Sequence, residues 1–111
     1  MAMPVRTPQE FLEQILPQKF DPNKAAGLAA TVQIRLSGEN GGDWTMTIRD
    51  GNLAVQRGTS ENPDMTITMK DKDYVDLVNG DLSGQKAFMT GKLKFKGDMN
   101  LGMKLQRLGL I

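Results

Sequence analysis

Apolar and polar residues alternate along the middle of the chain. Because successive side chains of a strand point to opposite faces, this alternation predicts strands with one apolar and one polar face. One-sided strands indicate a mostly antiparallel sheet with one face in water. Asp50-Gly51, between two of the runs, is a strong signal for a tight hairpin. We expect the alternating runs to form a four-strand meander; they cover residues 32–36, 44–48, 53–55 and 65–69.

Helix signals precede this region. Residues 7–10, Thr-Pro-Gln-Glu, have the order of a capping residue, a first helical proline and the acid of a capping box. The apolar residues of 11–16 then share one helical face. Pro17 predicts the end of this helix or a kink. The pair Asp-Pro repeats the start signal and predicts a short second helix over residues 21–26.

Three further helices and a fifth strand are predicted toward the C-terminus. Residues 92–96 alternate lysine with apolar residues, and lysines on the outer face suit an edge strand. The complete pattern is that of an α+β fold, a five-stranded, mostly antiparallel sheet with helices packed on one face, in a single domain over residues 1–111. The helices are expected from Asp71 to Gly80, from Ser83 to Gly91, and from Asp98 toward Leu108.

The last of these helices carries two apolar stripes. Leu101, Leu105 and Leu108 share one side, and Met99, Met103 and Leu110 share another. A surface helix on a sheet needs only one such stripe. The second stripe therefore meets another apolar surface, which is a ligand, a membrane or another helix such as the N-terminal one.

Composition narrows the chemistry. The chain has eight methionines, which suit an adaptable apolar surface or ordinary core filling, and it has no histidine or cysteine. A Ser-His-Asp or Cys-His arrangement is therefore excluded, and a zinc site would need carboxylates alone. We expect no enzymatic activity, no cofactor and no bound metal. Without cysteine there is no disulfide, and a reducing compartment, the cytoplasm, is the simplest location.

The charges nearly cancel, with 14 Lys and Arg against 13 Asp and Glu. No basic field is present to bind nucleic acid, and no apolar run is long enough to span a membrane. Asp71, Asp73 and Asp76 cluster, but acids at a helix start are expected from the helix dipole. The lysines of 92–96 form either a solvated edge or, with Lys104 and Arg107, a surface for transient contact with anionic membranes.

The C-terminal quarter of the chain resembles a known family. Residues 91–99, Gly-Lys-Leu-Lys-Phe-Lys-Gly-Asp-Met, followed by Leu101 and Met103-Lys104-Leu105, resemble the signature of the sterol carrier protein type 2 domain. Residues 85–88 and 64–69 are also similar to that family, and Trp44 stands in a matching strand, so the resemblance extends over residues 8–110. It implies helices over one sheet face and an apolar tunnel that binds and carries fatty acids, fatty acyl-CoA, sterols or phospholipids without transforming them.

The resemblance also implies a ligand site. Some relatives have glutamine at the position of Met103, so methionine there implies a drier site. The terminal Gly109-Leu110-Ile111 is not a peroxisomal address, which again favours the cytoplasm. By the resemblance, the residues that line the cavity are Phe88, Met89, Leu93, Phe95, Met99 and Met103, and Gln85 contacts a polar head group.

Other functions remain open at this point. The same fold can serve as a non-catalytic interaction or dimerisation module, with the second stripe covered by a protein partner that the sequence does not identify. It can also be an accessory domain that presents acyl-CoA to an enzyme. An enzyme in its own right is the third alternative, and the missing histidine and cysteine oppose it.

Overall fold

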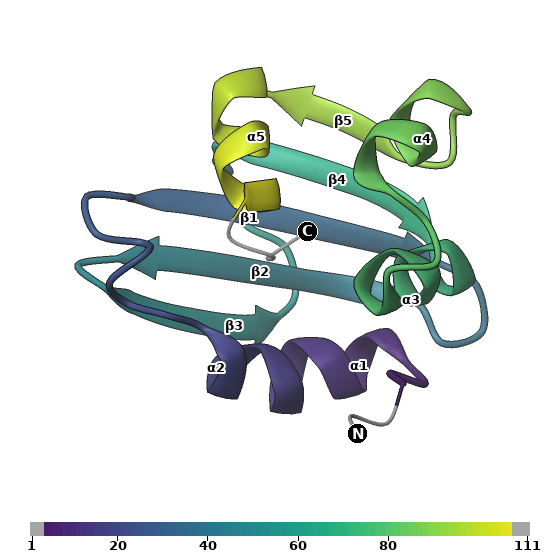
Figure 1. Ribbon diagram of the computed structural model, residues 1–111, viewed down its shortest axis with the longest axis horizontal. Coiled ribbons are helices and arrows are strands. Elements are labelled where there is room, and N and C mark those ends of the chain that lie inside the picture. The colour runs from purple at the N-terminus through teal and green to yellow at the C-terminus, as the bar shows by residue number, and fades with distance from the viewer. Residues whose placement is uncertain (1–3, 108–111) are drawn as a thin grey trace.

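The computed structural model describes residues 4–107. Leu108 and Leu110, which belong to the predicted stripes of the last helix, lie outside the described residues. Five strands form one sheet in the order β3-β2-β1-β4-β5 (Figure 1). The strands are β1 (Ala30–Ser37), β2 (Gly42–Arg49), β3 (Asn52–Arg57), β4 (Met65–Lys70) and β5 (Lys94–Gly97).

The sheet is mostly antiparallel, with one parallel pair, β1 and β4. The expected four-strand meander is therefore wrong, because only β1, β2 and β3 follow one another and β4 returns to the centre. Asp64 secures this return: its carboxylate accepts a hydrogen bond from the Thr31 N–H (2.8 Å), and its own N–H donates to the Thr31 carbonyl (2.8 Å). β3 remains an edge strand with exposed positions, whereas β1 and β4 bury their apolar residues beside each other.

The turn between β2 and β3 confirms the predicted hairpin. Asp50 has φ 54° and Gly51 has φ 77°. Positive φ at both central residues is the geometry of a type I′ turn, whose twist matches that of the strands it joins.

Helices cover the apolar face of the sheet. Ile34 lies opposite both Trp44 and Ile67, and all three are buried on this face. α5 crosses the face, while α3 and α4 lie at its end and α1 and α2 lie beside β3 (Figure 1). The helices are α1 (Pro8–Glu10), a π-helical segment (Phe11–Ile15), α2 (Leu16–Lys19), α3 (Asp71–Asn79), α4 (Gly84–Met89) and α5 (Met99–Arg107).

The N-terminal helix begins as predicted but continues past Pro17. The Thr7 hydroxyl accepts a hydrogen bond from the Glu10 N–H (3.2 Å), as the capping signal requires. Pro17 does not end the helix, because the π-helical segment before it has a wider turn in which the Leu16 N–H bonds to the Phe11 carbonyl. The wider turn accommodates the proline ring, and the helix ends at Lys19.

The predicted second helix over residues 21–26 is absent, and turns take its place. The Asp21 carboxylate accepts a hydrogen bond from the Asn23 N–H (2.9 Å), and the Ala25 N–H bonds to the Asp21 carbonyl (3.3 Å). Local side-chain bonds of this kind compete with helix propagation, which is unfavourable for so short a segment.

The later caps are confirmed, with one exception. Ser83 accepts from the Lys86 N–H (3.1 Å), and Asp98 accepts from the Asn100 N–H (2.9 Å). Asp71 was expected to cap α3 but is its first residue, after Lys70. Its buried carboxylate instead accepts a hydrogen bond from the Asn40 N–H (2.9 Å), which ties α3 to the turn between β1 and β2.

Candidate functional site

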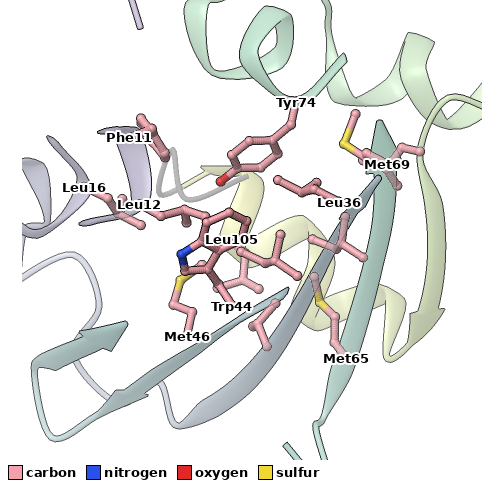
Figure 2. Close-up of a cluster of buried hydrophobic side chains, with 14 of the residues drawn as sticks. Phe11, Leu12, Leu16, Leu36, Trp44, Met46, Met65, Met69, Tyr74 and Leu105 are labelled. Carbon is pink, nitrogen blue, oxygen red and sulfur yellow. The ribbon is translucent and has the colours of Figure 1, made fainter. Parts of the chain in front are cut away.

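The helices over one half of the sheet close a solid core. Figure 2 shows Phe11 and Tyr74 facing each other above Trp44, with Leu12 and Leu105 beside them. The two rings meet edge to face, with centroids 6.1 Å apart. All five side chains are nearly inaccessible to solvent. These five side chains pack together as part of one buried cluster and leave no room for a ligand among them.

One polar group is enclosed in that core. The Tyr74 hydroxyl has no hydrogen-bond partner among the described residues. Burial raises the pKa of Tyr74, because the charged phenolate cannot be solvated there. The hydroxyl lies among apolar side chains and offers no chemistry to a substrate in this conformation.

The other half of the helix layer is hollow. A pocket of about 400 Å³ lies between α4, β5 and α5, with one contribution from α3. This volume falls within the roughly 300–1,000 Å³ that is usual for small-molecule sites. The residues that line it are Leu77, Gly84, Gln85, Phe88, Leu93, Phe95, Met99, Gly102, Met103 and Gln106.

Two glycines allow close approaches in the wall of the pocket. A Cβ on Gly102 would lie 3.0 Å from a ring carbon of Phe95, closer than an ordinary contact, so the absence of a side chain there lets the ring rest against α5. A Cβ on Gly84 would lie 2.9 Å from the amide nitrogen of Gln106, so α4 and the Gln106 side chain approach in the same way. Leu93, buried beneath, forms part of the apolar wall.

The pocket is apolar apart from two amides. Gln85 and Gln106 are the polar side chains of its lining, and no charged side chain of the described part of the chain lines it. An amide can donate and accept hydrogen bonds but carries no charge. The arrangement therefore suits a molecule with a long apolar part and a hydrogen-bonding end.

The structure brings together six of the seven residues predicted for the site. Met89 is the exception: it does not line the pocket, and 76% of its surface is exposed. Its neighbour Phe88 faces the pocket, and one residue later the helix has turned by about 100°. The six that meet in the pocket are Gln85, Phe88, Leu93, Phe95, Met99 and Met103.

Four lining residues were not predicted. Gln106 could have been predicted from the sequence, because it lies three residues after Met103 and therefore on the same face of α5. Leu77 belongs to α3, and only the fold shows that α3 reaches this pocket. Gly84 and Gly102 are revealed by the close approach of other groups, which the sequence does not show.

The two stripes of α5 have different surroundings. Leu105 is fully buried in the core and Leu101 is partly buried against it. Met99 and Met103 line the pocket, and about half of each side chain is exposed. The second stripe therefore borders the pocket and solvent.

The described residues, 4–107, contain neither a membrane-spanning helix nor a cluster of metal ligands. No helix there is long and apolar enough to cross a bilayer. No group of three or more His, Cys, Asp or Glu residues is placed to hold a metal ion in this part of the chain.

Comparison with known proteins gives a consistent result. A family model described as the SCP-2 sterol transfer family matches residues 9–109. Hydroxysteroid dehydrogenase-like protein 2 of Bos taurus is 40% identical over 81 residues, which are 71% of this chain and 19% of that protein. Human sterol carrier protein 2 is 42% identical over 67 residues, which are 60% of this chain and 12% of that protein. The chain thus spans less than a fifth of the length of these relatives.

A solved structure supports the fold. The palmitated sterol carrier protein 2 like 2 of Aedes aegypti, studied in solution, superposes with a TM-score of 0.71 at 22% identity. The superposition covers 94% of this chain and 95% of that one.

Proposed function

Because the chain belongs to the SCP-2 sterol transfer family, we propose that it binds and carries lipids in the pocket between α4, β5 and α5. Fatty acids and fatty acyl-CoA are the preferred ligands of this proposal, and sterol-like molecules and phospholipids are further candidates. The observation that carries it is the uncharged pocket of about 400 Å³, walled by Phe88, Phe95 and Met103. The palmitate bound by the Aedes aegypti protein supports the same class of ligand.

Burial of an acyl chain supplies the affinity. Each methylene that leaves water gains roughly 0.8 kcal/mol, so about fifteen methylenes gain roughly 12 kcal/mol. Association costs at least about 4 kcal/mol. The remaining free energy, roughly 8 kcal/mol, corresponds to micromolar binding. Such affinity allows the protein both to take up and to release its cargo.

The lining also sets the selectivity of the proposed site. Met99 and Met103 have flexible side chains that can adapt to acyl chains of different shape. Gln85 and Gln106 stand in the wall as partners for a carbonyl or hydroxyl group. The described lining offers a surface for binding without a charged side chain, and we propose that the cargo leaves unchanged.

α5 is the element that we expect to move when lipid enters. It forms one wall of the pocket with Met99, Gly102 and Met103, while Leu105 holds it to the core. An outward shift of its pocket side would enlarge the hollow without unfolding the sheet.

A second candidate is an accessory domain that presents acyl-CoA to an enzyme. The length of the relatives favours it, since this chain matches less than a fifth of each. Both candidates require the same pocket. For either one we propose the cytoplasm as the location, since a chain without cysteine suits a reducing compartment.

Native mass spectrometry of the purified protein, followed by organic extraction, tests the proposal. Fatty acid or fatty acyl-CoA should travel with the protein or bind when added at micromolar concentration. Met103→Trp places an indole in the pocket and should abolish this binding, whereas Met89→Trp, the same change outside the pocket, should preserve it. An apo mass that stays unchanged on lipid addition, or equal loss in both variants, would refute the proposed pocket.

A further inference from the structure

The exposed apolar side chains of this protein are concentrated at one place. Within residues 4–107 the large hydrophobic residues that remain exposed are Phe88, Met89, Met99 and Met103. All four belong to α4 or α5, the two helices that form the mouth of the pocket. Gathered exposed apolar residues mark a surface that meets something apolar.

Met89 shows that the pocket alone does not explain this cluster. It is the most exposed of the four, at 76%, and it does not line the pocket. A bound acyl chain inside the pocket would therefore leave it in water. Its exposed position leaves it available to an apolar partner outside the protein.

Charge is distributed unevenly along the chain, and the excess of positive charge lies in the same region. Residues 84–107 contain six Lys and Arg residues and one acid, Asp98. The rest of the chain contains eight Lys and Arg residues against 12 Asp and Glu residues. The helices at the pocket mouth thus belong to a basic segment of an otherwise acidic protein.

Three of these basic residues accompany the apolar ones on the helices. Lys86 lies on α4, and Lys104 and Arg107 lie on α5; all three are exposed. Arg107 follows Met103 by four residues, so the two share a helix face. The ion pairs found among the described residues, Arg35 with Asp43 and Arg57 with Glu13, lie elsewhere and leave these cations unneutralised by salt bridges.

We propose that this surface docks on an anionic phospholipid bilayer, with the mouth of the pocket turned toward the membrane. The docking surface consists of the apolar Phe88, Met89, Met99 and Met103 and the basic Lys86, Lys104 and Arg107. Apolar side chains enter the boundary between head groups and acyl chains, and the cations lie among the lipid phosphates. This inference rests on the proposed function, because docking would serve lipid transfer: lipid could pass between bilayer and pocket without crossing water.

A bilayer fits this surface better than a second copy of the chain. A symmetric dimer would bring the same patch against itself, and its cations would repel one another. The outer lysines of β5, Lys94 and Lys96, do not belong to the docking surface, because they alternate with pocket-lining Phe95 and point to the polar face of the sheet. The sequence had grouped these strand lysines with Lys104 and Arg107.

The test compares binding of the full chain to vesicles of phosphatidylcholine and to vesicles that also contain phosphatidylglycerol. We expect clear preference for the anionic vesicles. The double variant Lys86→Gln/Lys104→Gln should bind them about 25-fold more weakly, since each charge near an anionic surface contributes about fivefold. The double variant Lys24→Gln/Lys72→Gln removes the same charge from exposed positions outside the docking surface and should change binding less than about threefold.

Met89→Ser separates docking from lipid loading. It should weaken vesicle binding by about fivefold or more, while native mass spectrometry shows an unchanged lipid load, because Met89 does not line the pocket. Three results would overturn the docking inference while the proposed function stands, provided that lipid still binds. They are no binding to vesicles, equal binding by the two double variants, or vesicle binding that Met89→Ser does not change. If the protein docks as described but takes up no lipid, the proposed function fails and the docking surface stands. A dimer whose formation is lost in Met89→Ser would assign this surface to a second copy and overturn the inference.

Discussion

Two groups of helices cover the same sheet face in opposite ways. Over one half, the π-helical segment and α3 place the aromatic rings of Phe11 and Tyr74 above Trp44 in a buried cluster (Figure 2). Over the other half, α4 and α5 bring glycine and methionine to the sheet and leave a pocket of about 400 Å³. The strands beneath follow one alternating pattern, so the helices decide which half is closed. The closed half carries the buried aromatic residues of the core, and the open half carries the pocket of the proposed lipid site.

The largest expected effect on stability is found when a phenylalanine is replaced by alanine in each half and the two variants are compared. Phe11→Ala removes a ring that is 2% exposed and should lower the free energy of unfolding by about 4 kcal/mol, through lost burial and the cavity left behind. Phe88→Ala removes a ring that is 49% exposed and should cost less than about 1.5 kcal/mol while weakening lipid binding. Urea denaturation of both variants checks this. Similar losses of stability would show that the two halves do not differ in packing.

A second pair of variants moves the comparison onto one helix. Leu105→Ala in α5 should cost about 3 kcal/mol, because this side chain is fully buried in the core. Met103→Ala, two residues earlier, should cost less than about 1 kcal/mol, because its side chain faces the pocket and solvent. Thermal unfolding followed by circular dichroism gives both values. If the order were reversed, α5 would be held by its pocket side, and the assignment of its stripes would be wrong.

The smallest expected effect on stability concerns the Tyr74 hydroxyl, which is buried in the closed half without a described hydrogen-bond partner. Tyr74→Phe removes a buried hydroxyl without a described partner and should stabilise the protein by about 1 kcal/mol at neutral pH. Burial raises the pKa of Tyr74 above its ordinary value of 10.0, so above pH 10 the unfolded chain loses this proton while the folded protein keeps it.

The stability of the unmodified protein relative to Tyr74→Phe should therefore fall further above that pH, by up to about 1.4 kcal/mol per pH unit. Denaturation curves measured on both sides of pH 10 would reveal this difference. A variant less stable than the parent at neutral pH would mean that the hydroxyl makes a favourable contact in the folded protein.

Much of the fold could be predicted from local patterns. Alternation identified the strands, Asp50-Gly51 identified the hairpin, and Thr7 and Ser83 identified helix starts, because each depends on neighbouring residues. Strand partners could not be derived in this way. Alternation gives the face of each residue but not the neighbour of each strand, so the return of β4 to β1 was missed.

Local rules also failed where a distant contact or another turn prevailed. Asp71 is held by the Asn40 N–H from a turn remote in sequence, so it is not the cap that its position indicated. The π-helical segment carries the first helix past Pro17, so of the two predicted effects of this proline, a helix end or a kink, the helix end does not occur.

The part of the candidate site that lies in the family signature could be predicted from the sequence, and the part that lies outside it could not. Residues 85–103 supplied six of the predicted residues that meet in the pocket. Met89 shares that segment but faces solvent, since the exact rotation of a helix as short as α4 is fixed by packing. Leu77 and the close approaches at Gly84 and Gly102 follow from tertiary structure alone.

Hydrogen exchange with and without added palmitate tests the central claim most directly, because it reads both halves of the helix layer in one experiment. If lipid binds in the open half, amide exchange should slow in α4 and α5, whose residues line the pocket, and should stay unchanged in α1, α2 and most of α3. Met103→Trp serves as the blocked control and should show no change anywhere. Unaltered exchange in α4 and α5 at saturating palmitate, or slowing confined to the closed half, would contradict the account.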